Sequence, residues 1–354
     1  MHVKHSDPAG IKRILVVKLS SLGDIVHATP CLRAIREFFP AADISMVVDR
    51  RFADIIRHNP RKDALIESER RPGLLATWAG IRAELAPFLT GRARFDLAVD
   101  FQGTARSAAW VYASGARIKA GRGAMRPGWQ GAVSPDLSRH AVCVCAEIAR
   151  SLEIPVSDLN PEVFLSPTDE EVLNGILRAQ GVPREGFLLL NPFSRWESKE
   201  WPMERYVDML QQLGGEISLP VVLAGSAAEA TKAGELLRRL DTRQAWSLAG
   251  KLTLGQAACL YGRARLMLTG DSGPMHIAAA LGVPLVALFG PTLPEQTGPW
   301  GQAHMVVQAI RPAHHHVYRS DPEQTHMRAI DPATVLAAIR RQLRASEPNR
   351  RGGI

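Results

Sequence analysis

The sequence predicts an α/β protein built from two doubly wound parallel-sheet domains. Short apolar runs alternate with longer segments in which apolar residues recur at helical spacing. The alternation forms two series, and the stretch between them contains Pro155, Pro161, Pro167 and Pro183. Glycine-rich and polar loops follow several of the apolar runs, as they do where helices follow parallel strands. A chain of 354 residues, 46% of them hydrophobic, is long enough to build two cores.

The first series predicts an N-terminal domain over residues 11–165. Its opening run, RILVVK, is apolar without alternation, which is typical of a strand buried on both faces. A Ser/Gly-rich turn and a helical pattern follow, and Pro40 ends that helix. The predicted strands are 13–18, 43–48 and 97–100, and the predicted helices are 25–39, 74–89, 104–113 and 140–152.

The second series predicts a C-terminal domain over residues 166–330, followed by a helical segment over 331–346 that contains a helix at 332–344. Gly181 and the pair Gly214–Gly215 stand where two of its helices end. The predicted strands are 187–191, 220–224, 266–269 and 285–289, and the predicted helices are 168–180, 203–213, 227–240, 254–263 and 274–281. Since ligands of doubly wound sheets bind beyond the carboxyl ends of the strands, we expect a cleft shared by the two domains.

The composition limits the classes of partner that the protein is expected to bind. The formal net charge of +8 favours anionic partners, although a basic surface also serves solubility alone. No basic helix with interleaved aromatic residues is present, so nucleic acid is not expected as a partner. The N-terminus lacks the apolar segment of a signal peptide, and the longest apolar stretch, 277–289, is too short to span a bilayer. None of the four cysteines forms a CxxC pair, which predicts reduced thiols in the cytoplasm.

Two loops after predicted strands carry candidate catalytic groups. Asp24 ends the loop 18–24 and opens the following helix, where it serves either as a helix cap or as a general base. Ser194 and Lys199 lie in the loop 191–202, where a hydroxyl and an ammonium would suit a diphosphate. A solvated surface lysine is the alternative for Lys199.

Two further loops suit a nucleotide ligand. Glu229 follows the strand 220–224 at a position suited to ribose hydroxyls, and a solvated helix glutamate is the alternative. Asp271 lies between two glycines, and the backbone amides of 272–275 at the next helix start would face an anion. Neither GxxxxGK[ST] nor a GxGxxG after the first strand is present, which disfavours a P-loop kinase and a nicotinamide dehydrogenase.

Taken together, these segments resemble glycosyltransferase family 9, which contains the lipopolysaccharide heptosyltransferases. The matching text is VVKLSSLGDIVHATP, FDLAVDFQGTARS, SKEWP and TGDSGPMHIAAALGVPLVALFGPT. The resemblance extends from about residue 14 to 339 and implies a GT-B fold, in which two Rossmann-like domains face a central cleft. It implies that the N-terminal domain binds the acceptor and the C-terminal domain binds ADP-heptose. It further implies an inverting transfer that needs no metal ion and no other cofactor.

The resemblance also implies residue roles. Asp24 falls on the base, Lys199 on the diphosphate contact and Asp271 on the group that holds the sugar hydroxyls. The donor-binding positions are Ser194, Glu229, Leu252, Ser272, Gly273 and His276, and the acceptor-binding positions are Arg70, Arg71, Gln102 and Gly103. Ser107 and His140 also match positions of the family, and the alternative for these two residues is a purely structural role. The implied acceptor is a Kdo-containing lipid A core, so the enzyme is expected to be a cytoplasmic monomer held peripherally at the anionic inner membrane.

One segment departs from the family pattern. Histidines 314, 315, 316 and 326 stand where many relatives carry cysteines, and this segment is either a polar loop or a zinc site. Three other functions for the whole chain stay open. They are a family 9 transferase with another nucleotide sugar or a later core acceptor, a nucleotide-sugar epimerase, and a saccharide-binding protein without activity.

Overall fold

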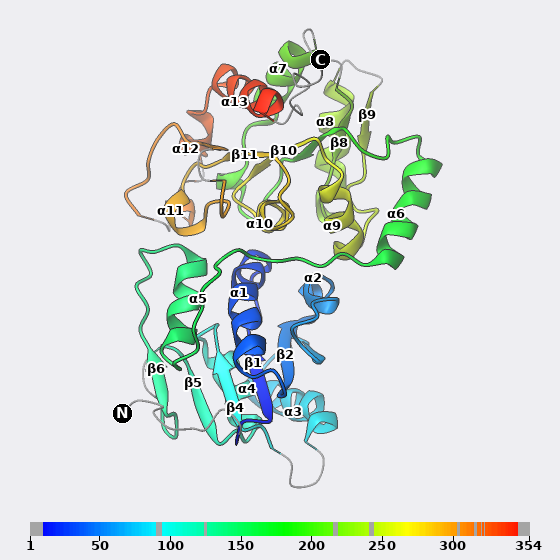
Figure 1. Cartoon of the computed structure of the whole chain (residues 1–354). Helices are drawn as coiled ribbons and strands as arrows, with labels where there is room; N and C mark the ends of the chain where they lie inside the picture. Colours follow the sequence, from blue (N-terminus) through cyan, green and yellow to red (C-terminus); the bar gives the residue numbers. More distant parts are fainter. Residues whose placement is uncertain are drawn as a thin grey trace, which may run out of the picture. The chain divides into compact units, whose positions relative to one another are not determined.

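The chain folds into two compact units, which a computed structural model describes at residues 10–89, 94–123, 126–214, 219–240, 244–302, 305–314, 317–319, 321 and 323–345. Unit 1 is Met1–Phe164 and unit 2 is Leu165–Ile354, so the division falls in the proline-rich stretch between the two series. Each unit contains one six-stranded sheet, and every strand pair in both sheets is parallel (Figure 1).

In unit 1 the strand order is β3-β2-β1-β4-β5-β6. The strands are β1 (Arg13–Val17), β2 (Asp43–Asp49), β3 (Ala64–Ser68), β4 (Leu97–Asp100), β5 (Ile118–Arg122) and β6 (Gly131–Val133). Helices α1 (Leu22–Phe38) and α5 (Ala141–Arg150) pack together, as do α3 (Leu74–Leu85) and α4 (Ala105–Ala113); the short α2 (Asp54–Arg57) follows β2. Apart from Arg13 and Asp100 at their ends, the central strands β1 and β4 are apolar and buried, as is typical where helices cover both faces of a sheet. Their register ends with Val17 opposite Asp100, so the loops after both strands leave the same edge.

In unit 2 the strand order is β12-β11-β10-β7-β8-β9. The strands are β7 (Leu188–Asn191), β8 (Val221–Leu223), β9 (Ala245–Ser247), β10 (Leu266–Gly270), β11 (Leu285–Leu288) and β12 (Val306–Val307). Helices α6 (Pro167–Ala179), α9 (Leu254–Gly262) and α10 (Gly273–Ala280) form one layer, and α7 (Met203–Gly214), α8 (Ala230–Arg239) and α13 (Pro332–Ala345) form the other (Figure 1). The short helices α11 (Pro294–Thr297) and α12 (Thr325–Arg328) follow β11 and precede α13. The terminal helix α13 is part of unit 2, where Val335, Leu336 and Ile339 join the main apolar core.

Five short strands were not predicted from the sequence. They are β3, β5, β6, β9 and β12, and four of them lie at sheet edges. Their burial is partial, so they lack the continuous apolar run that marks β1 or β7. Two predicted helices are also shorter than expected: α3 ends at Leu85 before the 3₁₀ turn Ala86–Phe88, which contains Pro87, and α8 begins after the 3₁₀ turn Ala227–Glu229.

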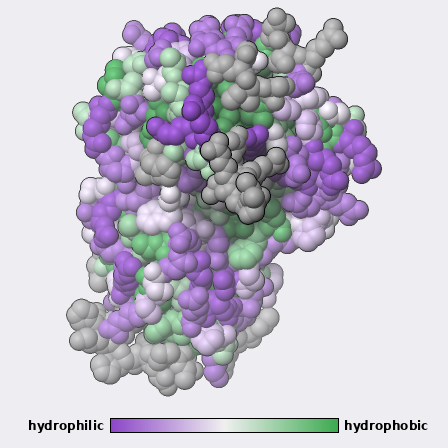
Figure 2. Space-filling model, turned by 45° about the horizontal axis from the view of Figure 1, so that its top comes forward, coloured by the Kyte–Doolittle hydropathy of each residue, from purple (hydrophilic) through white to green (hydrophobic). Residues whose placement is uncertain are grey.

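The described surface is largely hydrophilic on the face that Figure 2 shows, with smaller hydrophobic areas between the polar ones. Within the described ranges, no helix combines the length and the apolar character needed to cross a membrane.

Gly121 in β5 is a position where any side chain would collide with the neighbouring strand. A Cβ there would lie 2.4 Å from the backbone oxygen of Asp100. Gly121→Ala is therefore expected to lower the free energy of unfolding by about 1–3 kcal/mol, measured by denaturant titration. The control is Gly175→Ala in α6, where nothing lies within 4 Å of the new Cβ and a gain of about 0.5–1 kcal/mol is expected. Equal stability of the two variants would contradict the steric argument.

Candidate active site

Asp24 is held at the start of α1, at the carboxyl edge of the unit 1 sheet. Ser21 is the N-cap, and Asp24 Oδ2 accepts hydrogen bonds from the Ser21 backbone N–H at 2.9 Å and from its hydroxyl at 2.7 Å. The carboxylate is nevertheless 40% exposed, so one oxygen can serve the cap while the group stays accessible. The roles of cap and base are therefore compatible in Asp24.

The pKa of the Asp24 carboxyl lies well below its ordinary value. Burial opposes this shift, but the nearby ammonium of Lys18 and the two Ser21 hydrogen bonds outweigh it. Lys18 Nζ lies 3.5 Å from Asp24 Oδ1 and donates to the backbone oxygen of Phe101 at 3.3 Å. Only 2% of Lys18 is exposed. Asp24 is thus ionised at neutral pH, as a base must be, but it is a weak base.

Lys18 was not assigned a role from the sequence, and its effect on Asp24 can be tested. Lys18→Met is expected to raise the pKa of Asp24 because it removes the largest favourable charge interaction. The acid limb of kcat/KM reports the free enzyme's base, so it should move to higher pH, while the parent enzyme keeps its activity further into acid. Lys12→Met, which changes an exposed lysine, is the control. An unchanged acid limb in Lys18→Met would show that Lys18 does not set this pKa or that Asp24 is not the base.

The second loop of unit 1 is joined directly to the first. The Ser20 N–H donates to Gln102 Oε1 at 3.0 Å. Asp100, fully buried at the end of β4, accepts the N–H groups of Gln102 at 2.8 Å and Gly103 at 3.0 Å. Burial raises the pKa of Asp100, although these bonds work against the rise. The structure therefore brings Gln102 and Gly103 beside the Asp24 loop.

Ser107 and His140 both contribute hydrogen bonds at helix starts. The Ser107 hydroxyl donates to Asp100 Oδ2 at 2.8 Å, and Ser107 closes a capping box with Thr104 at the start of α4. His140 is the N-cap of α5, where its Nδ1 accepts the Val142 N–H at 3.2 Å.

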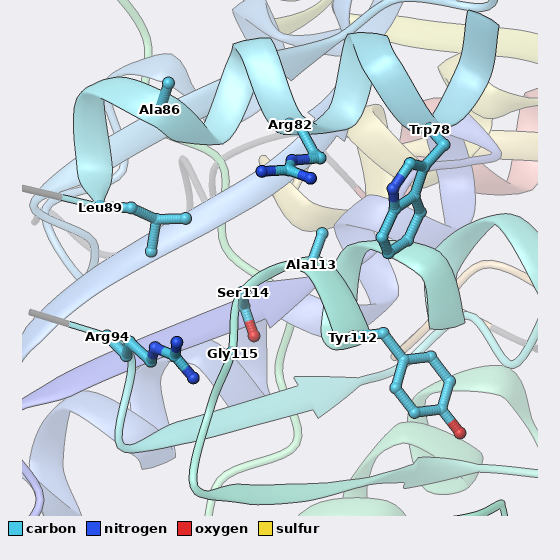
Figure 3. Close-up of a pocket in the computed structure, with 9 residues that line it drawn as sticks. All are labelled: Trp78, Arg82, Ala86, Leu89, Arg94, Tyr112, Ala113, Ser114 and Gly115. Carbon is cyan, nitrogen blue, oxygen red and sulfur yellow. The ribbon is translucent and has the colours of Figure 1, made fainter. Parts of the chain in front are cut away.

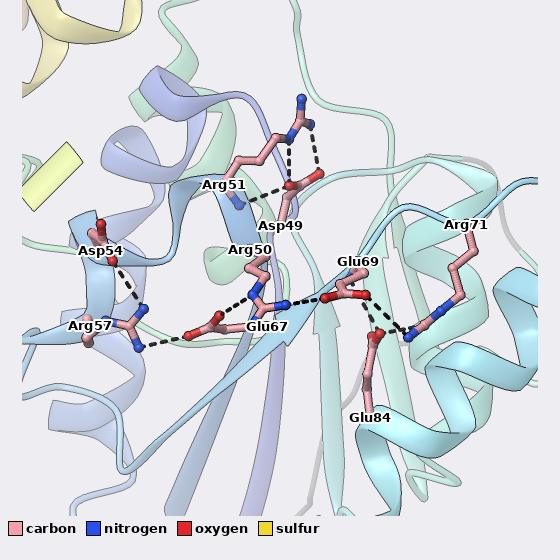
Figure 4. A network of polar contacts seen from close by, with 9 residues as sticks. All are labelled: Asp49, Arg50, Arg51, Asp54, Arg57, Glu67, Glu69, Arg71 and Glu84. Atoms are coloured by element: carbon pink, nitrogen blue, oxygen red, sulfur yellow. Dashed lines mark hydrogen bonds and ion pairs between the residues drawn. The ribbon is translucent and has the colours of Figure 1, made fainter. Parts of the chain in front are cut away.

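Arg70 and Arg71, predicted together as acceptor contacts, differ in their surroundings. Arg71 Nη1 lies 2.5 Å from Glu84 Oε1, and Arg71 Nη2 lies 3.7 Å from Glu69 Oε2. These contacts belong to a network in which arginines and carboxylates alternate (Figure 4). The Arg70 side chain is 63% exposed, and its Nε lies 3.5 Å from Oδ2 of the buried Asp49 carboxylate. Its charge is thus more available to a ligand than that of Arg71.

Two further arginines, neither of them predicted from the sequence, lie beside Asp49. Arg51 binds it through two nitrogens at 2.9 Å, and Arg106 lies 3.7 Å from it. Three guanidiniums around one carboxylate leave an excess of positive charge at the carboxyl end of β2, which suits an anionic ligand. We call Arg51, Arg70 and Arg106 the Asp49 arginine cluster.

In unit 2, Lys199 and Asp271 form an ion pair. Lys199 Nζ lies 2.7 Å from Asp271 Oδ2, and the two side chains are 14% and 8% exposed. The Lys199 ammonium also lies 4.7 Å from the centre of the Tyr318 ring. Burial raises the pKa of Asp271, but the Lys199 charge and hydrogen bond reverse this and leave it below the ordinary value. The solvated-lysine alternative for Lys199 is therefore wrong.

The other predicted donor positions lie in the loops or helices that follow strands at one edge of the sheet. Ser194 follows β7, Glu229 follows β8, and Ser272 and Gly273 follow β10, and these three strands are neighbours. Ser272 is the N-cap of α10, and His276 is buried in that helix. Glu229 accepts the Ser226 N–H at 2.6 Å in a capping box. Leu252 is half-buried just before α9.

The histidine segment shows no metal cluster within the described part of the chain. His326 Nδ1 lies 2.8 Å from Asp321 Oδ2, which holds the pKa of Asp321 below its ordinary range against the effect of burial. His314 is exposed, and His315 and His316 lie outside the described residues. No group of three or more potential ligands occurs among the residues that the structure describes.

Comparisons with known proteins show the family to which the chain is similar. The family described as "Glycosyltransferase family 9 (heptosyltransferase)" matches residues 89–326, well over half of the chain. Lipopolysaccharide heptosyltransferase 2 of Escherichia coli is 29% identical over 345 residues, covering 92% of this chain and 97% of that protein.

Solved structures share the architecture. A family 9 glycosyltransferase from Veillonella parvula superimposes with a TM-score of 0.82 at 24% identity, covering 94% of this chain and 97% of that one. The E. coli heptosyltransferase WaaC with ADP-2-deoxy-2-fluoro heptose gives 0.68 at 21% identity, covering 93% and 99%. A UDP-GlcNAc 2-epimerase from Methanocaldococcus jannaschii gives 0.55 at 13% identity, covering 94% and 92%, so the fold alone does not separate transferases from epimerases. The predicted GT-B fold is confirmed, and the chain belongs to glycosyltransferase family 9, as an enzyme that transfers glycosyl groups.

Proposed function

We propose that this enzyme transfers a heptose from ADP-heptose to the inner core of lipopolysaccharide, with inversion at the anomeric carbon and without a metal ion. The observation that carries the proposal is the buried Lys199–Asp271 pair beside the start of α10, in a chain of this family. The lipopolysaccharide assignment of the E. coli relative and the ADP-sugar bound to WaaC support the donor and acceptor.

In this proposal the donor binds unit 2. Glu229 holds the ribose, Leu252 faces the adenine, and Asp271 holds sugar hydroxyls. Lys199, Ser194 and the amides of Ser272 and Gly273 stabilise the diphosphate as the bond between the anomeric carbon and the phosphate oxygen breaks. A cation and amides held in place before the reaction can stabilise the leaving ADP without reorganisation.

The acceptor binds unit 1 in the same proposal. The Asp49 arginine cluster, with Gln102 and Gly103, holds the anionic sugar groups of a Kdo-containing lipid A core. Asp24 accepts the proton of the acceptor hydroxyl, whose oxygen attacks the anomeric carbon from the face opposite ADP. Because Asp24 is a weak base, the proton moves late, when the new bond is largely formed. A cytoplasmic monomer at the inner membrane fits a lipid-anchored acceptor.

The test combines purified enzyme, ADP-heptose and a Kdo-containing lipid A acceptor in the presence of EDTA. We expect the acceptor to gain the mass of one heptose and NMR to show the inverted anomer. Loss of activity with EDTA would overturn metal independence, and transfer from another nucleotide sugar only would overturn the donor. An altered sugar formed without acceptor would indicate an epimerase. Mass spectrometry of the core from a strain that lacks the protein would identify the heptose it adds.

A further inference from the structure

The N-terminal turn of α3 exposes large apolar side chains to water. Leu74 is 90% exposed, Leu75 87% and Trp78 41%. Leu74 lies on the same stripe of α3 as Ile81 and Leu85, at the spacings i+7 and i+11, but only those two are buried in the core. The exposed side chains therefore form an apolar face at the start of α3 that nothing within the described chain covers.

This face continues into an arginine-lined hollow. Leu75, Trp78 and Arg82 follow the spacing i, i+3 and i+7, which places them on one stripe of the helix. Trp78 and Arg82 also line a hollow of about 510 Å³ between α3 and the end of α4, together with Arg94 and Tyr112 (Figure 3). The same stripe thus passes from an apolar tip to a hollow with two guanidiniums and two aromatic rings.

The two arginines of the hollow differ from nearby arginines in their contacts with carboxylates. Arg82 and Arg94 are exposed, and neither makes an ion pair or a side-chain hydrogen bond with another residue of the described ranges. Arg71 and the arginines around Asp49 are instead engaged by carboxylates. Free guanidiniums bind phosphate groups well, because their planar fork matches phosphate oxygens.

We infer that the α3 face, made of Leu74, Leu75, Trp78, Arg82, Arg94 and Tyr112, docks the protein onto an anionic phospholipid surface. The leucines enter the boundary between head groups and acyl chains, the two aromatic rings lie at the head-group level, and the two arginines bind lipid phosphates. Charge complementarity favours this partner over a second copy of the chain. Self-association through this face would bring four guanidiniums together in a protein whose net charge is +8.

The position of the face suits a lipid-anchored substrate. Arg70 precedes Leu74 by four residues, so the docking turn directly follows the proposed acceptor contacts in unit 1. The inference extends the proposed function, but it can fail separately from it because lipid binding is measured without turnover.

The experiment is sedimentation of the whole protein with vesicles of phosphatidylcholine alone or mixed with phosphatidylglycerol. The parent protein should bind the anionic vesicles, and less so at high salt. The double variants Leu74→Ser/Leu75→Ser and Arg82→Gln/Arg94→Gln should each bind at least about tenfold more weakly, since each removes one of the two attractions. Leu137→Ser and Arg341→Gln change exposed residues elsewhere and should bind as the parent does.

Two readouts distinguish a loss of lipid binding from a loss of folding or catalysis. All variants should retain the parent's thermal midpoint and its transfer to a Kdo acceptor without acyl chains, because the changed side chains are exposed and lie outside the proposed active site. Equal vesicle binding by parent and α3 variants, or absence of parent binding, would overturn the inference. A parent dimer in light scattering that becomes a monomer in Leu74→Ser/Leu75→Ser would identify a second copy as the partner instead. Failed transfer by the parent would overturn the proposed function while leaving the vesicle result to stand.

Discussion

Replacing Asp24 with alanine is expected to lower turnover by roughly 100- to 10,000-fold while ADP-heptose still binds. A positioned general base contributes about this factor, and no other described carboxylate in the first loop of unit 1 can replace it. Donor binding should survive because the proposed donor contacts all lie in unit 2. Calorimetric titration of the donor and a product assay by mass spectrometry measure the two quantities separately.

The control for Asp24→Ala must separate the chemical role from the cap. Alanine also removes the acceptor of the Ser21 hydrogen bonds, which is expected to cost about 0.5–2 kcal/mol of stability. Asp24→Asn keeps an oxygen for those bonds but cannot accept the proton. We expect Asp24→Asn to be as inactive as Asp24→Ala and closer to the parent in unfolding free energy. Near-normal turnover in Asp24→Asn would refute the base assignment.

The sequence predicts the central strands well and the peripheral ones poorly, for a physical reason. Strands β1, β4, β7 and β10 are buried on both faces, so their apolar runs stand out from the chain. Strands such as β5 (IKAGR) and β9 (AWS) are only partly buried, and pairing with a neighbour rather than their own pattern makes them strands.

In the candidate site, too, some features can be predicted from the sequence and others cannot. Asp24, Lys199 and Asp271 are candidates from the sequence because each lies in a loop that follows a predicted strand. The pairing of such residues cannot be predicted in this way, because the contacts join distant parts of the chain: Lys199 and Asp271 are 72 residues apart, and Arg106 reaches Ser68. Lys18 carries one local signal, since it is a lysine that directly follows the apolar run of β1, and the fold buries it.

Some alternatives that the sequence posed as exclusive are compatible in the structure. Asp24 both caps α1 and keeps exposed carboxylate surface. Glu229, for which a solvated helix glutamate was the alternative, is half-buried in a capping box with Ser226 after β8. A carboxylate has two oxygens with several lone pairs, so one can satisfy the helix start and another can meet a ligand. A capping pattern is therefore weak evidence against a functional role.

Removing Lys199 is expected to damage donor binding, turnover and stability together. Lys199→Ala takes one charge-assisted contact from the diphosphate, and such hydrogen bonds contribute about 1.5–3 kcal/mol, or roughly 10- to 100-fold in donor affinity. It also leaves Asp271 buried without its cation, so the unfolding free energy should fall by about 3–5 kcal/mol. Donor titration, single-turnover kinetics and denaturant unfolding measure the three losses.

A second variant separates the stability effect from the binding effect. In Lys199→Met/Asp271→Asn both charges are removed, so no uncompensated charge stays buried and most of the stability should return. The ammonium contact to the diphosphate is still missing, while the asparagine that replaces Asp271 keeps a carbonyl oxygen for the sugar hydroxyls, so affinity should stay low. In the parent, the lowered pKa of Asp271 means that the pair stabilises the fold fully above the ordinary aspartate range and loses this contribution as acid protonates the carboxylate, whereas the double variant should lack that acid sensitivity. If donor affinity recovered along with stability, Lys199 would hold the loop in shape rather than contact the diphosphate.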